Sequence, residues 1–107
     1  LPLYVPSGGA CHGESSLRPQ NWGEAGSTRV DVQVRRLDDV LRDRVERVDV
    51  IKADIEGAEY LAFKGGIQTF RRFRPHVVFE VNAAAAATFG HGPYDALTLL
   101  LEEVGGY

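Results

Sequence analysis

The sequence predicts an α/β fold, and three observations lead to that prediction. Residues 48–53 and 76–81 are apolar, β-branched runs, typical of strands that are buried on both faces of a parallel sheet. Residues 57–73 lie between them and carry apolar side chains at helical spacing, so strand, helix and strand follow in order. A chain of 107 residues with 44% hydrophobic residues is large enough for one small domain with a modest core.

The helix over residues 57–73 is expected to break or kink within its length. Gly65-Gly66 lies inside it, and glycine costs about 1 kcal/mol per residue in a helix interior. Pro75 disfavours the helical conformation of the residue before it, so we expect the helix to end there. A second helix is predicted over residues 93–104, with Pro93 at its start and Gly105 as its C-cap. Its apolar face is expected to consist of Leu97, Leu100, Leu101 and Val104.

The N-terminal part of the chain is less regular. Residues 1–5 suit a short strand, and residues 6–28 read as a surface loop because they are rich in Gly, Ser, Pro and Asn without periodicity. Residues 30–34 alternate strictly, which predicts a strand with one solvent-facing side. Asp38 is the expected N-cap of a helix that follows, and the alanines of residues 83–87 suit loop filler or a first helical turn.

Composition narrows the classes of function. The net charge of −3 and the pI near 5.5 give no electrostatic case for binding nucleic acid or an anionic membrane. No apolar run approaches the roughly 20 residues that span a bilayer. Cys11 is the sole cysteine, so an internal disulfide is excluded, and a reducing compartment such as the cytoplasm is expected.

Both ends of the sequence look cut. There is no methionine, Leu1 begins as though within a strand, and Tyr107 follows directly after a helix end. We therefore expect residues 1–107 to be a single partial domain, with an irregular N-terminal segment over residues 1–29.

Acidic residues follow both apolar strands. Asp54 comes directly after the first strand, and Glu80 lies at the end of the second strand. Parallel sheets bind ligands beyond the carboxyl ends of their strands, and neighbouring strands lie about 5 Å apart. If the two strands are adjacent, Asp54 and Glu80 should therefore line one crevice. Asp54 could equally be a plain helix cap, whereas Glu80 stands between Phe79 and Val81, where an acid without a partner is costly.

Other polar residues near this edge have structural alternatives. Glu56 and Glu59 suit the first turn of a helix, where negative side chains are favoured by the helix dipole, and they could also contact a ligand. No metal is predicted, because D-x-E-x-x-E at a strand exit should spread its acids around the turn. His91, in the loop after the second strand, is the best general-base candidate by position, although a surface histidine without a role is the alternative. The arginines at positions 71, 72 and 74 are interpreted as solvated.

The order of these segments resembles the FkbM family of S-adenosylmethionine-dependent methyltransferases. The match covers about residues 30–107, and the K-x-D-x-E-G-x-E string within residues 52–59 is its most specific part. The remaining matching segments are VRRLDDVL at 34–41, KG at 64–65, RP at 74–75, VFE at 78–80 and GY at 106–107.

The resemblance implies a fold, a cofactor and a reaction. The fold would be the C-terminal half of a class I methyltransferase domain, with a Rossmann-like, mostly parallel sheet and flanking helices. The cofactor would be S-adenosylmethionine, and the partner a small-molecule acceptor, such as a sugar or secondary metabolite methylated on a hydroxyl group. Asp54, Glu80 and His91 would be the catalytic candidates, and Asp54 and Glu56 the cofactor-binding ones.

Two other functions stay open at this level. The chain could be a non-catalytic α/β module whose carboxylates only cap helices, or a different nucleotide-using enzyme, although it has no G-K-[ST] phosphate loop. The family's glycine-rich cofactor loop has no counterpart in these 107 residues. We therefore expect the isolated chain to bind the cofactor weakly and to be inactive.

Overall fold

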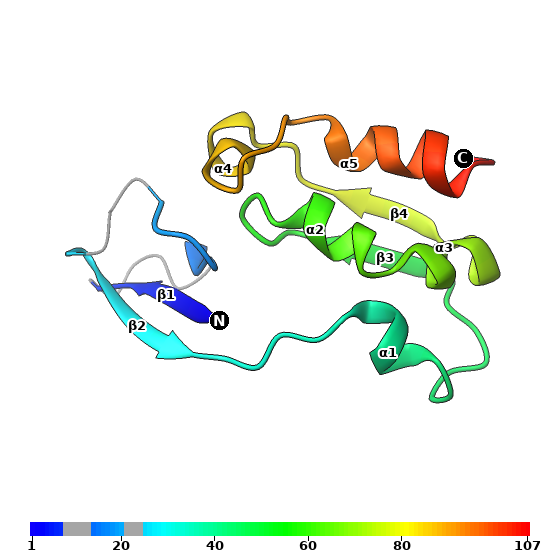
Figure 1. Cartoon of the computed structure of the whole chain (residues 1–107), viewed down its shortest axis with the longest axis horizontal. Helices are drawn as coiled ribbons and strands as arrows, with labels where there is room; N and C mark the ends of the chain where they lie inside the picture. The colour runs from blue at the N-terminus through cyan, green and yellow to red at the C-terminus, as the bar shows by residue number, and fades with distance from the viewer. Residues whose placement is uncertain (8–13, 21–24) are drawn as a thin grey trace.

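The computed structural model describes residues 1–7, 14–20 and 25–107 of the chain. In this part of the chain, four strands form two separate two-stranded sheets, and helices pack against one of the two (Figure 1). The predicted α/β class is confirmed. The expectation of a mostly parallel sheet is not met within the described residues, because one strand pair is parallel and the other is antiparallel.

The parallel pair consists of β3 (Val50–Ala53) and β4 (His76–Phe79). Val50 lies opposite His76 and Ala53 opposite Phe79, so the two strands run side by side without a stagger. The predicted order of strand, helix and strand is thus confirmed, although each strand is two residues shorter than its apolar run.

The crossover between β3 and β4 is broken at the predicted place. It contains α2 (Glu59–Lys64) and α3 (Ile67–Phe73), which are separated by Gly65-Gly66. A Cβ atom on Gly66 would lie 2.8 Å from Cδ2 of Leu37, so the break also lets the chain of α1 (Leu37–Leu41) approach closely.

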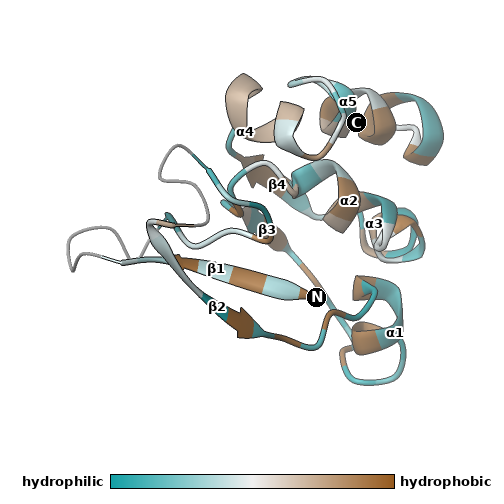
Figure 2. Cartoon of the chain, turned by 60° about the vertical axis from the view of Figure 1, so that its left-hand side comes forward, coloured by the Kyte–Doolittle hydropathy of each residue, from teal (hydrophilic) through white to brown (hydrophobic). Residues whose placement is uncertain are grey.

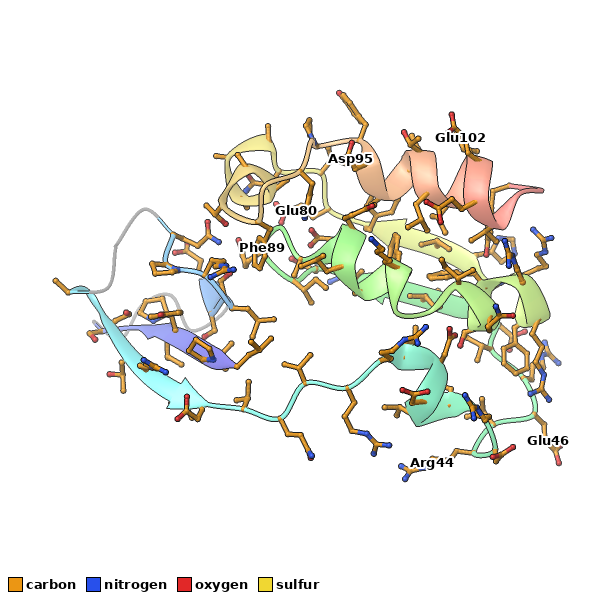
Figure 3. The ribbon with its side chains drawn as sticks, viewed as in Figure 1. Arg44, Glu46, Glu80, Phe89, Asp95 and Glu102 are labelled. Carbon is orange, nitrogen blue, oxygen red and sulfur yellow. The ribbon has the colours of Figure 1, made fainter. Side chains whose placement is uncertain are left out.

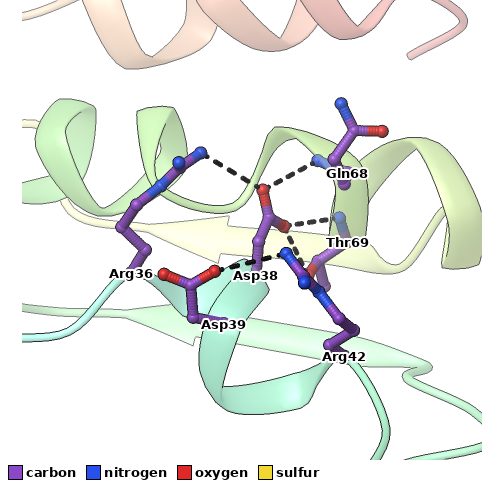
Figure 4. A network of polar contacts seen from close by, with 6 residues as sticks. All are labelled: Arg36, Asp38, Asp39, Arg42, Gln68 and Thr69. Carbon is purple, nitrogen blue, oxygen red and sulfur yellow. Dashed lines mark hydrogen bonds and ion pairs between the residues drawn. The ribbon is translucent and has the colours of Figure 1, made fainter.

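Asp38 does not cap α1, contrary to the prediction, since Arg36 is the N-cap of that helix. Its buried carboxylate instead accepts hydrogen bonds from the backbone N–H groups of Gln68 and Thr69, at 3.2 and 2.8 Å (Figure 4). The Thr69 hydroxyl donates a further bond of 2.8 Å to the same carboxylate. Asp38 therefore satisfies the free N–H groups at the start of α3, a helix about 30 residues away along the chain.

Helices cover one face of the parallel pair. α5 (Asp95–Thr98) continues as the π-helical segment η2 (Leu99–Val104), and the predicted end at Gly105 is confirmed by its φ of 71°. Figure 2 shows hydrophobic colour along β3 and β4, and alternating brown and teal on the helices against them. The buried core consists of Ala53, Phe63, Phe70, Ala96, Leu99, Leu100 and Val104.

Two predicted core positions are wrong. Leu97 and Leu101 are 41% and 48% exposed, because the buried side of α5 and η2 runs through Ala96, Leu99 and Leu100. Leu97 precedes the π-helical segment, and Ala96, Leu99 and Leu100 keep ordinary helical spacing, so the buried stripe is rotated by one residue from the predicted one.

The other face of the parallel pair is open, so the predicted burial on both faces is not met within the described chain. Val50 and Val78 point away from the helices and are 59% and 58% exposed. Ile51 and Val77 alternate with them and pack on the core, as expected from the period of two in a strand.

A hairpin-like sheet lies beyond the carboxyl ends of β3 and β4, on the left of Figure 1. It pairs β1 (Pro2–Pro6) with β2 (Ser27–Asp31) in antiparallel register. The predicted strand over residues 1–5 is confirmed, whereas the strand predicted over residues 30–34 begins earlier and ends at Asp31. Among residues 1–7, 14–20 and 25–107, no helix combines the length and the apolar character that a membrane span requires.

The arginines at the end of α3 are not simply solvated, contrary to the expectation from the sequence. Arg71 donates a 2.6 Å hydrogen bond to the carbonyl of Glu103, and Arg74 donates to the carbonyl of Gly105. Both contacts tie the end of α3 to the end of η2, where carbonyl groups have no helical partner.

Candidate functional site

Three carboxylates meet at the carboxyl end of the parallel pair. Asp54 follows Ala53 and Glu80 follows Phe79, and these two preceding residues are partners in the sheet. The backbone N–H of Glu80 donates a 3.1 Å hydrogen bond to the carbonyl of Ala53, which extends the pairing by one residue. Oxygen atoms of Asp54, Glu56 and Glu80 all lie within 4.8 Å of one another. The predicted proximity of Asp54 and Glu80 is confirmed, although only Glu80 of these two lines the adjoining cleft. We call the three residues the acidic edge.

The expectation that the acids after β3 spread around the turn is wrong for Glu56. This residue lies outside α2, and its backbone is left-handed, with φ of 54°. The turn brings the Glu56 carboxylate back toward Asp54 and Glu80 instead of leaving it on the first helical turn.

Glu59 does behave as a structural residue. It lies in the first turn of α2, is 5% exposed, and accepts a 2.9 Å hydrogen bond from the backbone N–H of Ile55. That bond closes the loop between β3 and α2, and Glu59 is not one of the three carboxylates that meet at the acidic edge.

Charges at the acidic edge are only partly neutralised. The Lys52 ammonium lies 3.2 Å from a carboxylate oxygen of Asp54, and both side chains are more than half exposed. Burial raises the pKa of Glu56 above its ordinary value of 4.5, and the negative charges of Glu80 and Asp54 raise it further. The acidic edge is therefore a place where an added positive charge would be favoured.

An open cleft of about 240 Å³ adjoins the acidic edge. It is lined by Glu14, Gln20, Glu56, Glu80, Asn82, Ala84 and Ala85. Asn82 is the N-cap of α4 (Ala83–Thr88), and its side-chain oxygen accepts a 3.1 Å hydrogen bond from the backbone N–H of Ala85. The alanine run is thus a helix, one of the two predicted alternatives.

Sequence reasoning missed three polar residues of this cleft, namely Asn82, Glu14 and Gln20. Asn82 could have been found, because an Asn directly before a run of good helix formers is a helix-start signal. Glu14 and Gln20 lie in the segment interpreted as a surface loop, and no periodicity connects them with the strands.

His91 lies next to the acidic edge but lines a different, much smaller cavity, which it shares with Glu59 and Glu80. Its ring packs between Tyr60 and Phe89, with centroid distances of 5.0 and 6.1 Å. Both ring nitrogens are buried and have no hydrogen-bond partner among the described residues. Glu80 and Phe89 are both labelled in Figure 3, near α4.

The chemistry of these side chains limits what they can hold. Three carboxylates within 4.8 Å suit a cationic group of a ligand or a hard cation, and exposed acidic groups also occur together without either. Cys11 and His12, whose side chains could also bind a metal, lie outside the described residues.

The comparisons with known proteins identify the family. The model of the methyltransferase FkbM domain matches residues 3–105. The chain belongs to the FkbM methyltransferase domain family. The resemblance found in the sequence motifs is thereby confirmed, and it extends through the N-terminal residues that the motifs matched only loosely.

One curated relative supports the assignment. Methyltransferase sdnD of Sordaria araneosa is 43% identical to this chain over 49 residues. The aligned stretch covers 37% of this chain and 19% of that protein, so the comparison concerns a small part of the relative. No solved structure matches the chain significantly.

Proposed function

We propose that this chain forms one wall of the active site of an S-adenosylmethionine-dependent methyltransferase that methylates a hydroxyl group on a sugar or secondary metabolite. The observation that carries the proposal is the meeting of Asp54 and Glu80 at the carboxyl ends of adjacent parallel strands. Ligands of open α/β sheets bind at this place. Membership in a methyltransferase family supports methyl transfer as the reaction.

The acidic edge fits the charge of the proposed cofactor. S-adenosylmethionine supplies an activated methyl group and carries a sulfonium and an ammonium group, both positively charged. Carboxylates of Asp54 or Glu56 would bind the ammonium group. Burial and, after it, the negative charges of Glu80 and Asp54 raise the pKa of Glu56, and a bound cation would offset the charge repulsion. The open cleft beside them is polar on the side of Glu14 and Gln20.

Within this proposal the residues of the chain align the acceptor and take up its proton. Asp54 would orient the acceptor hydroxyl and accept its proton as a general base, since it is half exposed at the strand end. Glu80 is the second candidate for the same role. His91 lines the smaller cavity and its ring nitrogens have no partner among the described residues, so it would act only on an acceptor that reaches this cavity.

The proposal is tested by replacing Asp54 with Asn in the full-length protein. We expect S-adenosylmethionine-dependent product formation, followed as release of S-adenosylhomocysteine with hydroxylated acceptors, to fall by about 100-fold or more. The matched control is Asp49→Asn, because Asp49 is also exposed and paired, with Arg47 at 2.5 Å, but precedes β3. Unchanged turnover in the Asp54 variant would remove this residue from the mechanism.

The alternative, a non-catalytic module whose carboxylates only cap helices, is supported by the role of one acidic residue. Glu59 accepts a backbone hydrogen bond at the start of α2, as a structural carboxylate should. Across the described part of the chain, no backbone N–H donates to the carboxylates of Asp54 or Glu80, so neither acts as a helix cap. We further propose that the 107-residue chain alone binds the cofactor weakly, because it offers the acidic wall without a glycine-rich loop.

A further inference from the structure

The segment of residues 14–20, which we call the strap, connects the N-terminal sheet with the acidic edge. Ser16 is 2% exposed and forms an isolated antiparallel bridge with Tyr4 of β1. The bridge has two backbone hydrogen bonds, of 2.8 Å from the Tyr4 N–H and of 3.0 Å from the Ser16 N–H. The strap is therefore fixed on one side by β1.

On its other side the strap holds the backbone of Glu56. The Ser16 hydroxyl and the Gln20 amide both donate to the Glu56 carbonyl, at 3.4 and 3.2 Å. The Gln20 amide also donates to the Ser16 hydroxyl at 3.0 Å, and the Arg18 backbone N–H does so at 3.4 Å. Ser16 and Gln20 thus act as one hydrogen-bonded unit on a single carbonyl group.

The carbonyl that they hold belongs to an unfavourable backbone conformation. Glu56 has φ of 54°, a region that residues with a Cβ atom rarely occupy without support. The next residue, Gly57, has φ of 92°, and its backbone packs against α4 so closely that a Cβ atom would lie 2.4 Å from the carbonyl carbon of Ala85. The loop is therefore held from one side by the strap and from the other by α4.

We propose that Ser16 and Gln20 are positioning residues, which keep Glu56 left-handed so that its carboxylate stays at the acidic edge and faces the cleft. Without the two donors, the Glu56 backbone would relax, and its carboxylate would leave Asp54 and Glu80 for solvent. The role of Glu56 toward the cofactor ammonium group rests on the proposed function, whereas its placement by the strap does not. The site is thus completed by residues about 40 positions earlier in the sequence.

The first arm of the test measures binding of S-adenosylmethionine to the full-length protein by isothermal titration calorimetry. Gln20→Met keeps the length of the side chain and removes the two hydrogen bonds of the amide, to the Glu56 carbonyl and to the Ser16 hydroxyl. We expect about three- to tenfold weaker binding. Gln33→Met is the control, because Gln33 is exposed between β2 and α1 and is not among the residues that line the cleft beside the acidic edge. In a Glu56→Ala background, Gln20→Met should have no further effect, whereas a merely structural role of Gln20 would weaken binding in both backgrounds.

The second arm needs no ligand. An NMR titration of the side-chain carboxyl of Glu56 should give a pKa above 4.5 in the wild type and a value closer to 4.5 in Gln20→Met, because the carboxylate has become more exposed and has left its acidic neighbours. An unchanged Glu56 pKa in the variant overturns the inference. If the wild type fails to bind S-adenosylmethionine, the proposed function is wrong, and the titration alone decides whether the strap positions Glu56.

Discussion

The helix-covered face of the parallel pair and its carboxyl edge are built in opposite ways. The covered face is apolar and densely packed, with Phe63 and Phe70 almost completely buried and their rings in edge-to-face contact at 5.1 Å. The carboxyl edge gathers three carboxylates and two consecutive residues with positive φ, Glu56 and Gly57. The first region is held together by apolar packing, and the second combines charge repulsion with an unfavourable backbone.

This difference indicates that stability and function are carried by different residues. Burial of large aromatic side chains is strongly stabilising, whereas clustered like charges and left-handed residues lower stability and persist where the surrounding structure holds them. At the carboxyl edge the support comes from Gln20 on one side and Ala85 on the other. Substitutions on the helix-covered face should therefore reduce stability, and substitutions at the carboxyl edge should reduce binding.

The largest effect on stability is expected in the core. Phe70→Ala removes a ring that is 0% exposed and should lower the free energy of unfolding by about 3–5 kcal/mol. Val78→Ala, on the open face of the same sheet, should change it by about 0.5 kcal/mol or less, because Val78 is 58% exposed. Urea denaturation of both variants measures the contrast, and equal losses would mean that the two faces are covered alike.

Gly57→Ala should lower the free energy of unfolding nearly as much as Phe70→Ala, for a different reason. The new Cβ would meet the backbone of α4 at 2.4 Å in addition to the unfavourable φ, so we expect a loss of about 3 kcal/mol or more. Gly90→Ala is the matched control, since Gly90 has φ of 82° but no atom within 4 Å of the position that an added methyl group would take. It should lose only about 1–2 kcal/mol by thermal or urea unfolding. If the two variants unfold alike, the close approach to α4 is not what requires glycine.

A smaller loss is expected from Asp38→Ala. It leaves two backbone N–H groups at the start of α3 without their acceptor, so the free energy of unfolding should fall by about 1–3 kcal/mol. Asp39→Ala breaks only an exposed ion pair with Arg42 at 3.5 Å, and should cost about 0.5 kcal/mol or less. Calorimetric melting of both variants tests the assignment, which fails if Asp39→Ala is the more destabilising of the two.

The smallest effect is a dependence on pH. Because the pKa of Glu56 is raised in the folded state, the folded chain holds that proton more tightly than the unfolded chain. This contribution is fully present below the ordinary value of 4.5 and is lost as the pH rises through the raised pKa. Glu56→Gln cannot ionise, so its unfolding free energy relative to wild type should increase from acidic to neutral pH. Parallel pH profiles for the two proteins would contradict this.

Much of the fold could be predicted because its signals are local. The apolar strands, the break at Gly65-Gly66 and the helix end at Gly105 each depend on a few neighbouring residues. Adjacent parallel strands then place Asp54 beside Glu80, which follows from topology without any further contact.

The remaining features depend on contacts between distant segments. Asp38 satisfies N–H groups of a helix about 30 residues later, and the strap reaches Glu56 from about 40 residues earlier. The positive φ of Glu56 is not encoded by its residue type. Which side of α5 and η2 is buried depends on their packing against α2 and α3, and helical spacing alone does not fix it. The open face beside Val78 likewise contradicts what its apolar sequence alone suggests.

The central claim is that the acidic edge faces the methyl donor. A crystal structure of the full-length protein with S-adenosylhomocysteine tests it most directly. The proposed function predicts the ammonium group of that molecule within hydrogen-bond distance of a carboxylate of Asp54 or Glu56, with Glu80 facing the same cleft. Binding elsewhere in the protein, with all three carboxylates left facing solvent, would contradict it.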